Sequence, residues 1–208
     1  MKKYNVIFFD WDGVITDSVN IKTESYYDMF ADFGIDVQNK VKEHHLLNGG
    51  MSRFEKFKLY YKEFLGKDIS QDKVIELSNE FSDLVMKKVA SAPFIEGAVE
   101  TIKREYENGT KLFVVTGTPT EEIKEIAKQK GLYNYFVDFC GSPKKKIPWV
   151  KELIEKYNLK KDDCLFVGDA MVDYNAALEN GIDFLGIKIK SCKTKFPDGT
   201  IVKEKVEL

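Results

Sequence analysis

The chain has 208 residues, 43% of them apolar, which is enough for one well-formed core with a smaller accompanying domain. Its 32 basic and 34 acidic residues nearly balance, which excludes the strongly basic surface that nucleic-acid backbones require. The three cysteines are widely spaced, the first apolar run is interrupted by Asp10, and no segment reaches membrane-spanning length, so we expect a soluble, cytoplasmic protein with reduced thiols.

Residues 6–9 form an apolar run typical of a buried parallel strand, and it leads directly to Asp10 and Asp12. Gly13 allows a sharp turn where this strand ends. Ligands bind at the carboxyl ends of strands in open α/β sheets, so the two carboxylates are candidates for chemistry. Taken alone, they could equally end a strand and begin a turn.

The segment from residue 20 to residue 92 predicts helices and no strand. The helices are expected over 26–33, ending at Gly34, over 41–47, from Ser52 to Gly66, and from about Ser70 to Val89. Ser52 is the predicted N-cap of the third helix, with Glu55 as its capping-box partner. The aromatic residues of this segment are most simply its own core, and Pro93 marks the end of the insertion.

From Ala98 onwards, strands alternate with helices, which predicts a parallel sheet with right-handed crossovers. Helices are expected over 98–107, 121–130, 148–157 and around 176–178, and strands over 112–115, 136–140, 164–167 and 184–187. Pro148 is expected at the first position of its helix. Cys140 and Cys164 are expected as thiols within strands, and residues 197–200 predict a hairpin turn at the sheet edge.

Polar residues follow the predicted strands in succession: Asp10 with Asp12, Thr116 with Gly117, Lys144 to Lys146, and Asp169 with Asp173. Each group has a plain alternative, namely a hydroxyl at a strand end, a solvated lysine face or a turn. Their coincidence at successive strand ends favours one shared site. Clustered carboxylates require a cation, and oxygen ligands suit Mg²⁺. A hydroxyl, a backbone N–H and a lysine suit the oxygens of a phosphoryl group.

Four stretches resemble, in order, the four motifs of the haloacid dehalogenase superfamily: Asp10-Trp11-Asp12-Gly13-Val14, Val115-Thr116-Gly117-Thr118, a lysine after Gly141-Ser142-Pro143, and Gly168-Asp169-Ala170-Met171-Val172-Asp173. The resemblance spans the chain. It implies an α/β fold with a flavodoxin-like (Rossmannoid), doubly wound parallel sheet and an inserted helical cap. We therefore expect a catalytic core of residues 1–17 and 93–208 and a cap of residues 18–92.

The resemblance also implies a role for each acidic residue of the motifs. Asp10 would attack phosphorus and form an aspartyl-phosphate, and Asp12 would be the general acid and then the general base. Mg²⁺ would be bound by Asp10, the backbone carbonyl of Asp12 and Asp169, with Asp173 as a further ligand or a supporting acid.

The remaining motif residues would bind the phosphoryl group. Thr116 and the N–H of Gly117 would hold its oxygens, and Lys146 would offset their negative charge. Lys146 is preferred to Lys144 and Lys145 because it comes just before the helix predicted at Pro148.

Within the superfamily, Asp12 argues against dehalogenation and phosphonate cleavage, because members with those activities lack this acid. A Mg²⁺-dependent phosphatase acting on a small phosphorylated metabolite is therefore expected. The alternative is a sugar-phosphate mutase, since Gly50-Met51-Ser52-Arg53 resembles the β-phosphoglucomutase branch as much as the phosphoglycolate-phosphatase branch. Lys22 stands where those mutases have a hinge histidine, which counts against the mutase.

Arg53 and Lys56 lie one helical turn apart and are candidates for binding an anionic part of the substrate, unless both are solvated helix residues. His44 and His45 are expected on a helix without a catalytic role. A phospho-accepting receiver domain and a non-catalytic ligand-binding protein are less favoured alternatives. The expected partner is a small phosphate ester, without nucleic acid or membrane, and the chain is expected to be a monomer or weak homodimer.

Overall fold

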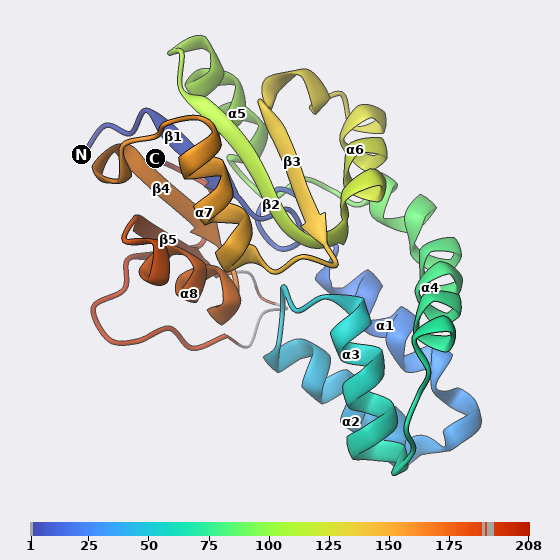
Figure 1. The fold of residues 1–208 in the computed structure, drawn as a ribbon. Helices are drawn as coiled ribbons and strands as arrows, with labels where there is room; N and C mark the ends of the chain where they lie inside the picture. The colour runs from blue at the N-terminus through green and yellow to red at the C-terminus, as the bar shows by residue number, and fades with distance from the viewer. Residues whose placement is uncertain (1, 189, 191–193) are drawn as a thin grey trace.

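The computed structural model describes residues 2–188, 190 and 194–208. Its centre is a parallel sheet (Figure 1) of β1 (Val6–Phe9), β2 (Lys111–Pro119), β3 (Asp138–Ser142), β4 (Cys164–Gly168), β5 (Asp183–Ile187) and β6 (Val202–Lys203). The strand order is β3-β2-β1-β4-β5-β6, and every neighbouring pair is parallel. This is the Rossmann order, which differs from the flavodoxin order 2-1-3-4-5, so Rossmannoid is the more accurate description of the predicted doubly wound sheet.

Helices cover both faces of the sheet because the central strand is buried on both sides. Ile7 and Phe9 pack beneath α5 (Ala98–Glu107) and α6 (Thr120–Gln129), and Val6 and Phe8 pack beneath α7 (Lys146–Lys156) and α8 (Met171–Asn180). In Figure 1, α7 lies in front of the sheet and α5 behind it. Full burial of each such apolar side chain stabilises the folded state by about 1.5–3 kcal/mol. A strand that is buried on both faces therefore needs an unbroken run of apolar residues.

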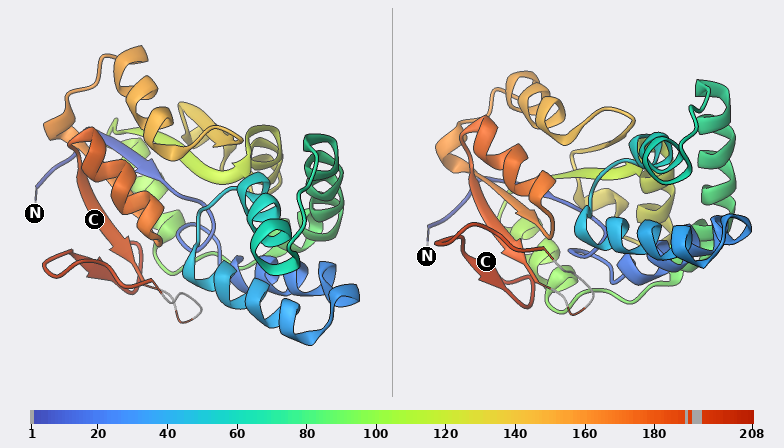
Figure 2. Two further views of the ribbon diagram at one scale, coloured as in Figure 1. Left: turned by 60° about the horizontal axis from the view of Figure 1, so that its bottom comes forward. Right: turned by 90° about the horizontal axis from the view of Figure 1, so that it is seen from below.

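Between β1 and α5 the chain forms a helical insertion, by which we mean residues 19–91. It contains α1 (Val19–Met29), α2 (Ile35–Leu47), α3 (Arg53–Leu59) with a π-helical turn (Tyr60–Phe64), and α4 (Gln71–Ser91). Figure 2 shows it beyond the carboxyl ends of the strands. Tyr26 and Phe81 stack there at 4.2 Å between ring centroids, next to Phe57, so the aromatic residues form the core of the insertion.

The helix signals of the insertion are largely confirmed. Ser52 and Ser70 are N-caps whose hydroxyl groups accept hydrogen bonds from the backbone N–H groups of Glu55 and Lys73. The Glu55 carboxylate accepts from the Ser52 hydroxyl at 3.2 Å, whereas in a capping box it would accept from the Ser52 backbone. Gly34 separates the first two helices as predicted, but α2 begins at Ile35, six residues before the predicted start.

Two local predictions for the second half were wrong. Helix α7 begins at Lys146, so Pro148 is its third residue, a position where the missing N–H still has no acceptor within the helix. The turn at Pro197 exists, with the Thr200 N–H donating to its carbonyl at 3.1 Å. It does not close a hairpin, because β6 pairs in parallel with β5.

Cys140 and Cys164 are buried free thiols in β3 and β4, as predicted, whereas Cys192 lies outside the described residues. Within the ranges that the structure describes, no helix combines the length and the apolar character needed to cross a membrane.

Candidate active site

The candidate site lies at the carboxyl ends of β1, β2 and β4, where the strand order of the sheet reverses. Asp10 directly follows β1, and its backbone N–H still donates to the carbonyl of Val167 in β4 at 3.0 Å. Asp169 directly follows β4, and Thr116 lies in the second half of β2. In doubly wound sheets, this reversal forms a crevice that binds ligands. Residues from separate strand ends are therefore neighbours here.

Asp10 is almost completely buried, and both of its carboxylate oxygens are held. Oδ1 accepts a hydrogen bond from the backbone N–H of Trp11 at 2.7 Å, and Oδ2 pairs with Nζ of Lys146 at 2.7 Å. Lys146 also pairs with Asp173 at 2.6 Å. Burial alone would lower the pKa of Lys146, but the two carboxylates raise it above its usual value, so the ammonium group stays charged.

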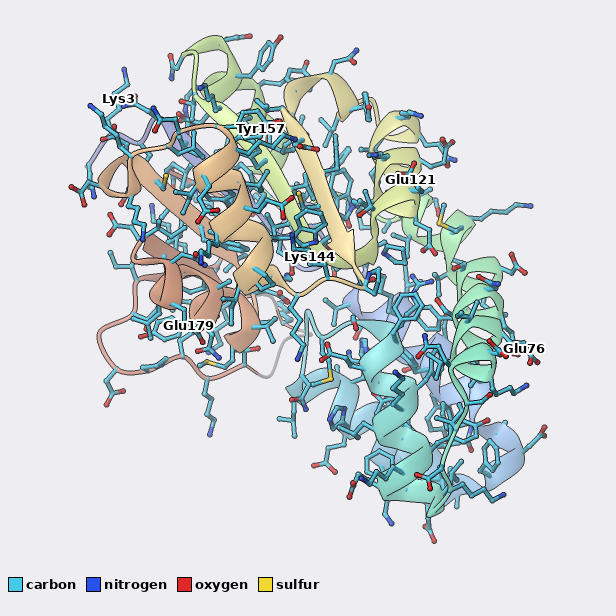
Figure 3. The ribbon with its side chains drawn as sticks, in the orientation of Figure 1. Lys3, Glu76, Glu121, Lys144, Tyr157 and Glu179 are labelled. Carbon is cyan, nitrogen blue, oxygen red and sulfur yellow. The ribbon has the colours of Figure 1, made fainter. Side chains whose placement is uncertain are left out.

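The three consecutive lysines point in different directions. Lys146 turns inward as the first residue of α7, whereas Lys144 pairs with Glu152, and Lys145 pairs with Glu55 at 2.8 Å, on the outside of the molecule. Figure 3 shows Lys144 in the turn between β3 and α7. Of these side chains, Lys146 is the one that the structure brings to Asp10.

Three buried carboxylates, those of Asp10, Asp169 and Asp173, each place an oxygen within 4.8 Å of the others. Burial and the neighbouring carboxylates raise the pKa of Asp169 well above its usual range, and burial raises the pKa of Asp173 to about 7. Among the described residues, Lys146 forms ion pairs with two of these carboxylates, those of Asp10 and Asp173. An all-oxygen donor set of this kind fits a hard divalent cation such as Mg²⁺.

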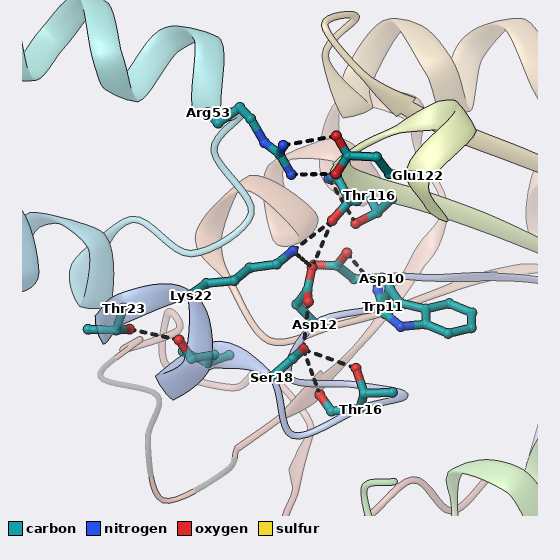
Figure 4. A network of polar contacts seen from close by, with 12 residues as sticks. Asp10, Trp11, Asp12, Thr16, Ser18, Lys22, Thr23, Arg53, Thr116 and Glu122 are labelled. Carbon is teal, nitrogen blue, oxygen red and sulfur yellow. Dashed lines mark hydrogen bonds and ion pairs between the residues drawn. The ribbon is translucent and has the colours of Figure 1, made fainter. Parts of the chain in front are cut away.

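The carboxylate of Asp12 lies outside this cluster and has its own partners (Figure 4). Oδ1 accepts from the Ser18 hydroxyl at 2.5 Å, and Oδ2 accepts from Lys22 and from the Thr118 hydroxyl, the latter at 3.0 Å. Burial alone would raise the pKa of Asp12, but these donors lower it below its usual value. Asp12 is therefore ionised in this arrangement, and its backbone carbonyl is the part that would serve a cation.

Two glycines of the site allow close approaches, one to the acidic cluster and one to the insertion. Gly13 has φ of 80°, and a Cβ there would lie 2.3 Å from Oδ2 of Asp169. A Cβ on Gly117 would lie 2.6 Å from the carbonyl oxygen of Gly50, in the loop between α2 and α3. This loop of the insertion therefore lies directly against the candidate phosphoryl site.

The core and the insertion together line a partly open cavity of about 50 Å³. Thr116 is buried on its wall, and its hydroxyl accepts from the Thr118 N–H at 3.3 Å. The other lining residues that concern the site are Asp10, Asp12, Gly117, Thr118 and Asp169 of the core, and Lys22, Tyr26, His45, Gly50, Arg53 and Lys56 of the insertion.

Arg53 is buried, so the interpretation of a solvated helix residue is wrong for it. Its guanidinium forms a bidentate ion pair with Glu122 of α6, with Nη1 to Oε1 at 2.9 Å and Nη2 to Oε2 at 2.8 Å (Figure 4). Nη1 also donates to the carbonyl of Ser78 and the hydroxyl of Ser82 in α4. Arg53 thus joins two helices of the insertion to the core.

Lys56 is also buried, with 1% of its surface exposed, and Nζ lies 2.7 Å from Nδ1 of His45. Burial lowers the pKa of His45 well below its usual value, so the imidazole is neutral and offers a lone pair to the ammonium group. Lys56 and Arg53 therefore line the same cavity with different partners.

Comparison with known proteins agrees with this architecture. A profile of the haloacid dehalogenase-like hydrolases matches residues 4–181. The chain belongs to this family.

Relatives with this fold include phosphatases. A phosphoglycolate phosphatase of Vibrio parahaemolyticus is 26% identical over 191 residues, covering 88% of this chain and 82% of the relative. The crystal structure of a Clostridium difficile protein assigned as a phosphatase matches with a TM-score of 0.70 and 25% identity, covering 99% of this chain and 96% of that one. A Bacteroides vulgatus protein assigned as a β-phosphoglucomutase shares the fold, with a TM-score of 0.76 and 17% identity over 98% of this chain and 84% of its own. This haloacid dehalogenase-like hydrolase thus has phosphatases among the proteins that it resembles over most of its length.

Several residues of the hydrolase site were not among those predicted. Ser18 and Thr118 hold Asp12, and Lys22 had been considered only as a departure from the mutases. Their spacing was a usable signal: Ser18 and Lys22 share one face at the start of a helix, and Thr118 shares a strand face with Thr116. Glu122 carries no such signal, because an acidic residue in the first turn of a helix is usually solvated.

Proposed function

We propose that this haloacid dehalogenase-like hydrolase is a Mg²⁺-dependent phosphatase that hydrolyses a small phosphorylated metabolite through an aspartyl-phosphate on Asp10. The main observation is that the two carboxylates have different surroundings. Asp10 is buried, with Oδ2 paired with Lys146 and Oδ1 accepting a hydrogen bond from a backbone N–H. Asp12, two residues later, accepts hydrogen bonds from a separate set of donors. Two carboxylates in different surroundings suit two different roles.

In the first step, Asp10 attacks phosphorus and the bond to the leaving oxygen breaks, while Asp12 donates a proton to that oxygen. A dianionic phosphoryl group next to Asp12 favours protonation of its carboxylate, which supplies this proton. In the second step, Asp12 takes a proton from water, which attacks the phosphorus and releases phosphate from Asp10. Thr116 and the N–H of Gly117 hold the phosphoryl oxygens, and Lys146 balances their charge.

Mg²⁺ would be bound by Asp10, Asp169, Asp173 and the backbone carbonyl of Asp12, and it would neutralise phosphoryl charge so that an anionic nucleophile can approach. The chain's own contribution is to hold these oxygens in a buried cluster with Lys146 beside them. We further infer that residues 18–92 act as a cap over a core of residues 1–17 and 93–208. The shared cavity supports a cap that shuts out bulk water during turnover.

The relatives named phosphoglycolate phosphatase make phosphoglycolate the first substrate to test. The mutase alternative is supported by the shared fold and by the resemblance of Gly50-Met51-Ser52-Arg53 to that branch, a resemblance that the phosphatase branch shares equally. Lys22, which pairs with Asp12, stands at the position of the mutase histidine and favours the phosphatase.

The test is release of inorganic phosphate from phosphoglycolate and from p-nitrophenyl phosphate, with Mg²⁺ and with EDTA. The wild-type enzyme should be active only with Mg²⁺, and Asp10→Asn should be inactive on both compounds. Unchanged turnover by Asp10→Asn would show that Asp10 is not the nucleophile. Full activity in EDTA would show that the reaction does not need Mg²⁺. Conversion of β-glucose 1-phosphate in the presence of its bisphosphate activator, without phosphate release, would identify the mutase instead.

A further inference from the structure

The two buried cations of α3, Arg53 and Lys56, differ in whether a carboxylate already neutralises them. Both oxygens of Glu122 lie on the Arg53 guanidinium, and the Ser82 hydroxyl donates to the same carboxylate. A bidentate pair is the strongest geometry between these groups. A carboxylate of the substrate would have to displace an identical, intramolecular carboxylate, so binding at Arg53 would bring no net gain.

Lys56 lies in the opposite situation. Its contacts are the neutral imidazole of His45 and the ring of Tyr26, whose centroid is 5.5 Å from Nζ. In the described part of the chain, no carboxylate forms an ion pair with Lys56. Burial and the nearby charge of Lys22 lower the pKa of Lys56 to about 7, although the more distant carboxylates of Asp12 and Asp169 act to raise it. A buried cation without an anionic partner, on the wall of the cavity, is a place where a ligand's anion would be stabilised.

We propose that Lys56, supported by His45, binds a carboxylate on the leaving group of the substrate, and that Arg53 does not. The substrate class is then a short phosphorylated carboxylic acid. This assignment rests on the proposed phosphatase function. A carboxylate is favoured over a second phosphoryl group because Lys56, which lines the same cavity as Asp10, supplies one positive charge, and this matches the single charge of a carboxylate better than the charge of nearly two on a phosphate. Arg53 and Glu122 instead join the insertion to the core.

The experiment compares kcat/KM for phosphoglycolate, for ethyl phosphate, which lacks the carboxylate, and for ethanediol bisphosphate, which replaces it with a second phosphate. The wild-type enzyme should prefer phosphoglycolate to both. Lys56→Met should lower the phosphoglycolate to ethyl phosphate ratio about 100-fold, since a charge-assisted hydrogen bond in a buried site is lost. Lys56→Gln, which keeps a donor without the charge, should lower it less. Lys58→Met, at an exposed position of the same helix, should leave the ratio unchanged.

Several outcomes overturn the assignment. An unchanged ratio in folded Lys56→Met, checked by circular dichroism, removes Lys56 from carboxylate binding. A selective loss of phosphoglycolate turnover in Glu122→Gln or Arg53→Met, which should affect both monoesters alike, returns the role to Arg53. A preference of the wild-type enzyme for the bisphosphate, or for ethyl phosphate, rejects the carboxylate class while the phosphatase stands. Absence of turnover of every compound, p-nitrophenyl phosphate included, rejects the proposed function itself.

Discussion

Lys22 of α1 pairs directly with the carboxylate of Asp12, and it also donates at 2.7 Å to the hydroxyl of Thr118, which in turn donates to the same carboxylate. The contact joins the first helix of the insertion to the proposed acid and base of the core. Because Lys22 is the main cause that lowers the pKa of Asp12, it sets the pH range in which each of the two proton transfers can occur.

Lys22→Met should shift the pH–rate profile to higher pH. Without the ammonium group, the pKa of Asp12 rises, so the base form appears only at higher pH and the acid form persists to higher pH. We expect both limbs of the profile to move upward and kcat to fall roughly 10- to 100-fold. Lys42→Met, which removes an exposed pair with Glu24, is the control. If neither limb of the pH–rate profile moves in Lys22→Met, Lys22 does not control the pKa of Asp12.

Asp169→Asn should remove the response to Mg²⁺ while stabilising the metal-free protein. Three buried carboxylates repel one another, so deleting one charge should raise the melting temperature measured in EDTA. In the wild-type protein, Mg²⁺ at 100 times its Kd should add about 2.7 kcal/mol of stability. Thermal unfolding with and without Mg²⁺ measures both effects. A wild-type melting temperature that does not respond to Mg²⁺ would contradict the metal site.

Lys56→Met should stabilise the unliganded protein at neutral pH. The pKa of Lys56 falls from 10.5 to about 7 on folding, so the unfolded chain binds more protons between these values and stability rises with pH there. Below pH 7, the full cost of burying the charge is present, at about 1.4 kcal/mol per pKa unit. The variant lacks this cost. Its stability in urea should therefore exceed that of the wild type at pH 6 to 7, and the difference should shrink toward pH 10. A difference that does not vary with pH would show that Lys56 is not buried as a free cation.

Gly13→Ala should be far more harmful than the same change at Gly34. Both residues have positive φ, and Gly34 also has ψ of 162°, a region that essentially only glycine occupies, so backbone strain costs an alanine about 1–3 kcal/mol. At Gly13 the new methyl would also lie 2.3 Å from Asp169, whereas at Gly34 nothing lies within 4 Å. Urea unfolding and phosphate release should show a stability loss with unchanged activity for Gly34→Ala, and a larger stability loss with little activity for Gly13→Ala. Equal effects would mean that the turn is not pressed against the carboxylate.

The parts of this molecule that depend on short-range pattern could be predicted from the sequence. Asp10, Thr116 and Asp169 follow apolar runs, and parallel strands carry their carboxyl ends to one edge, so their meeting required only strand recognition. The helix predicted at Pro148 also favoured Lys146 over Lys144 and Lys145, and Lys146 is the first residue of that helix.

What could not be predicted depends on contacts between distant segments. Glu122 neutralises Arg53 across the boundary between the core and the insertion, and nothing in the local pattern of either helix indicates the other. The same is true of β6, because the turn at Pro197 does not indicate the parallel pairing of this strand with β5. Only the three-dimensional structure therefore shows that Arg53, a candidate for binding the substrate, already forms an ion pair within the protein.

The close approach of Gly117 to the carbonyl of Gly50 has an evolutionary consequence. At Gly117 the insertion contacts the phosphoryl site with peptide backbone, and apart from Lys22, which pairs with Asp12, the side chains of helices α1 to α4 line the leaving-group end of the cavity. Substitutions along those helices can thus exchange one accepted metabolite for another while the atoms around phosphorus keep their surroundings. The residues that perform the reaction can therefore stay the same while the residues that select the substrate change.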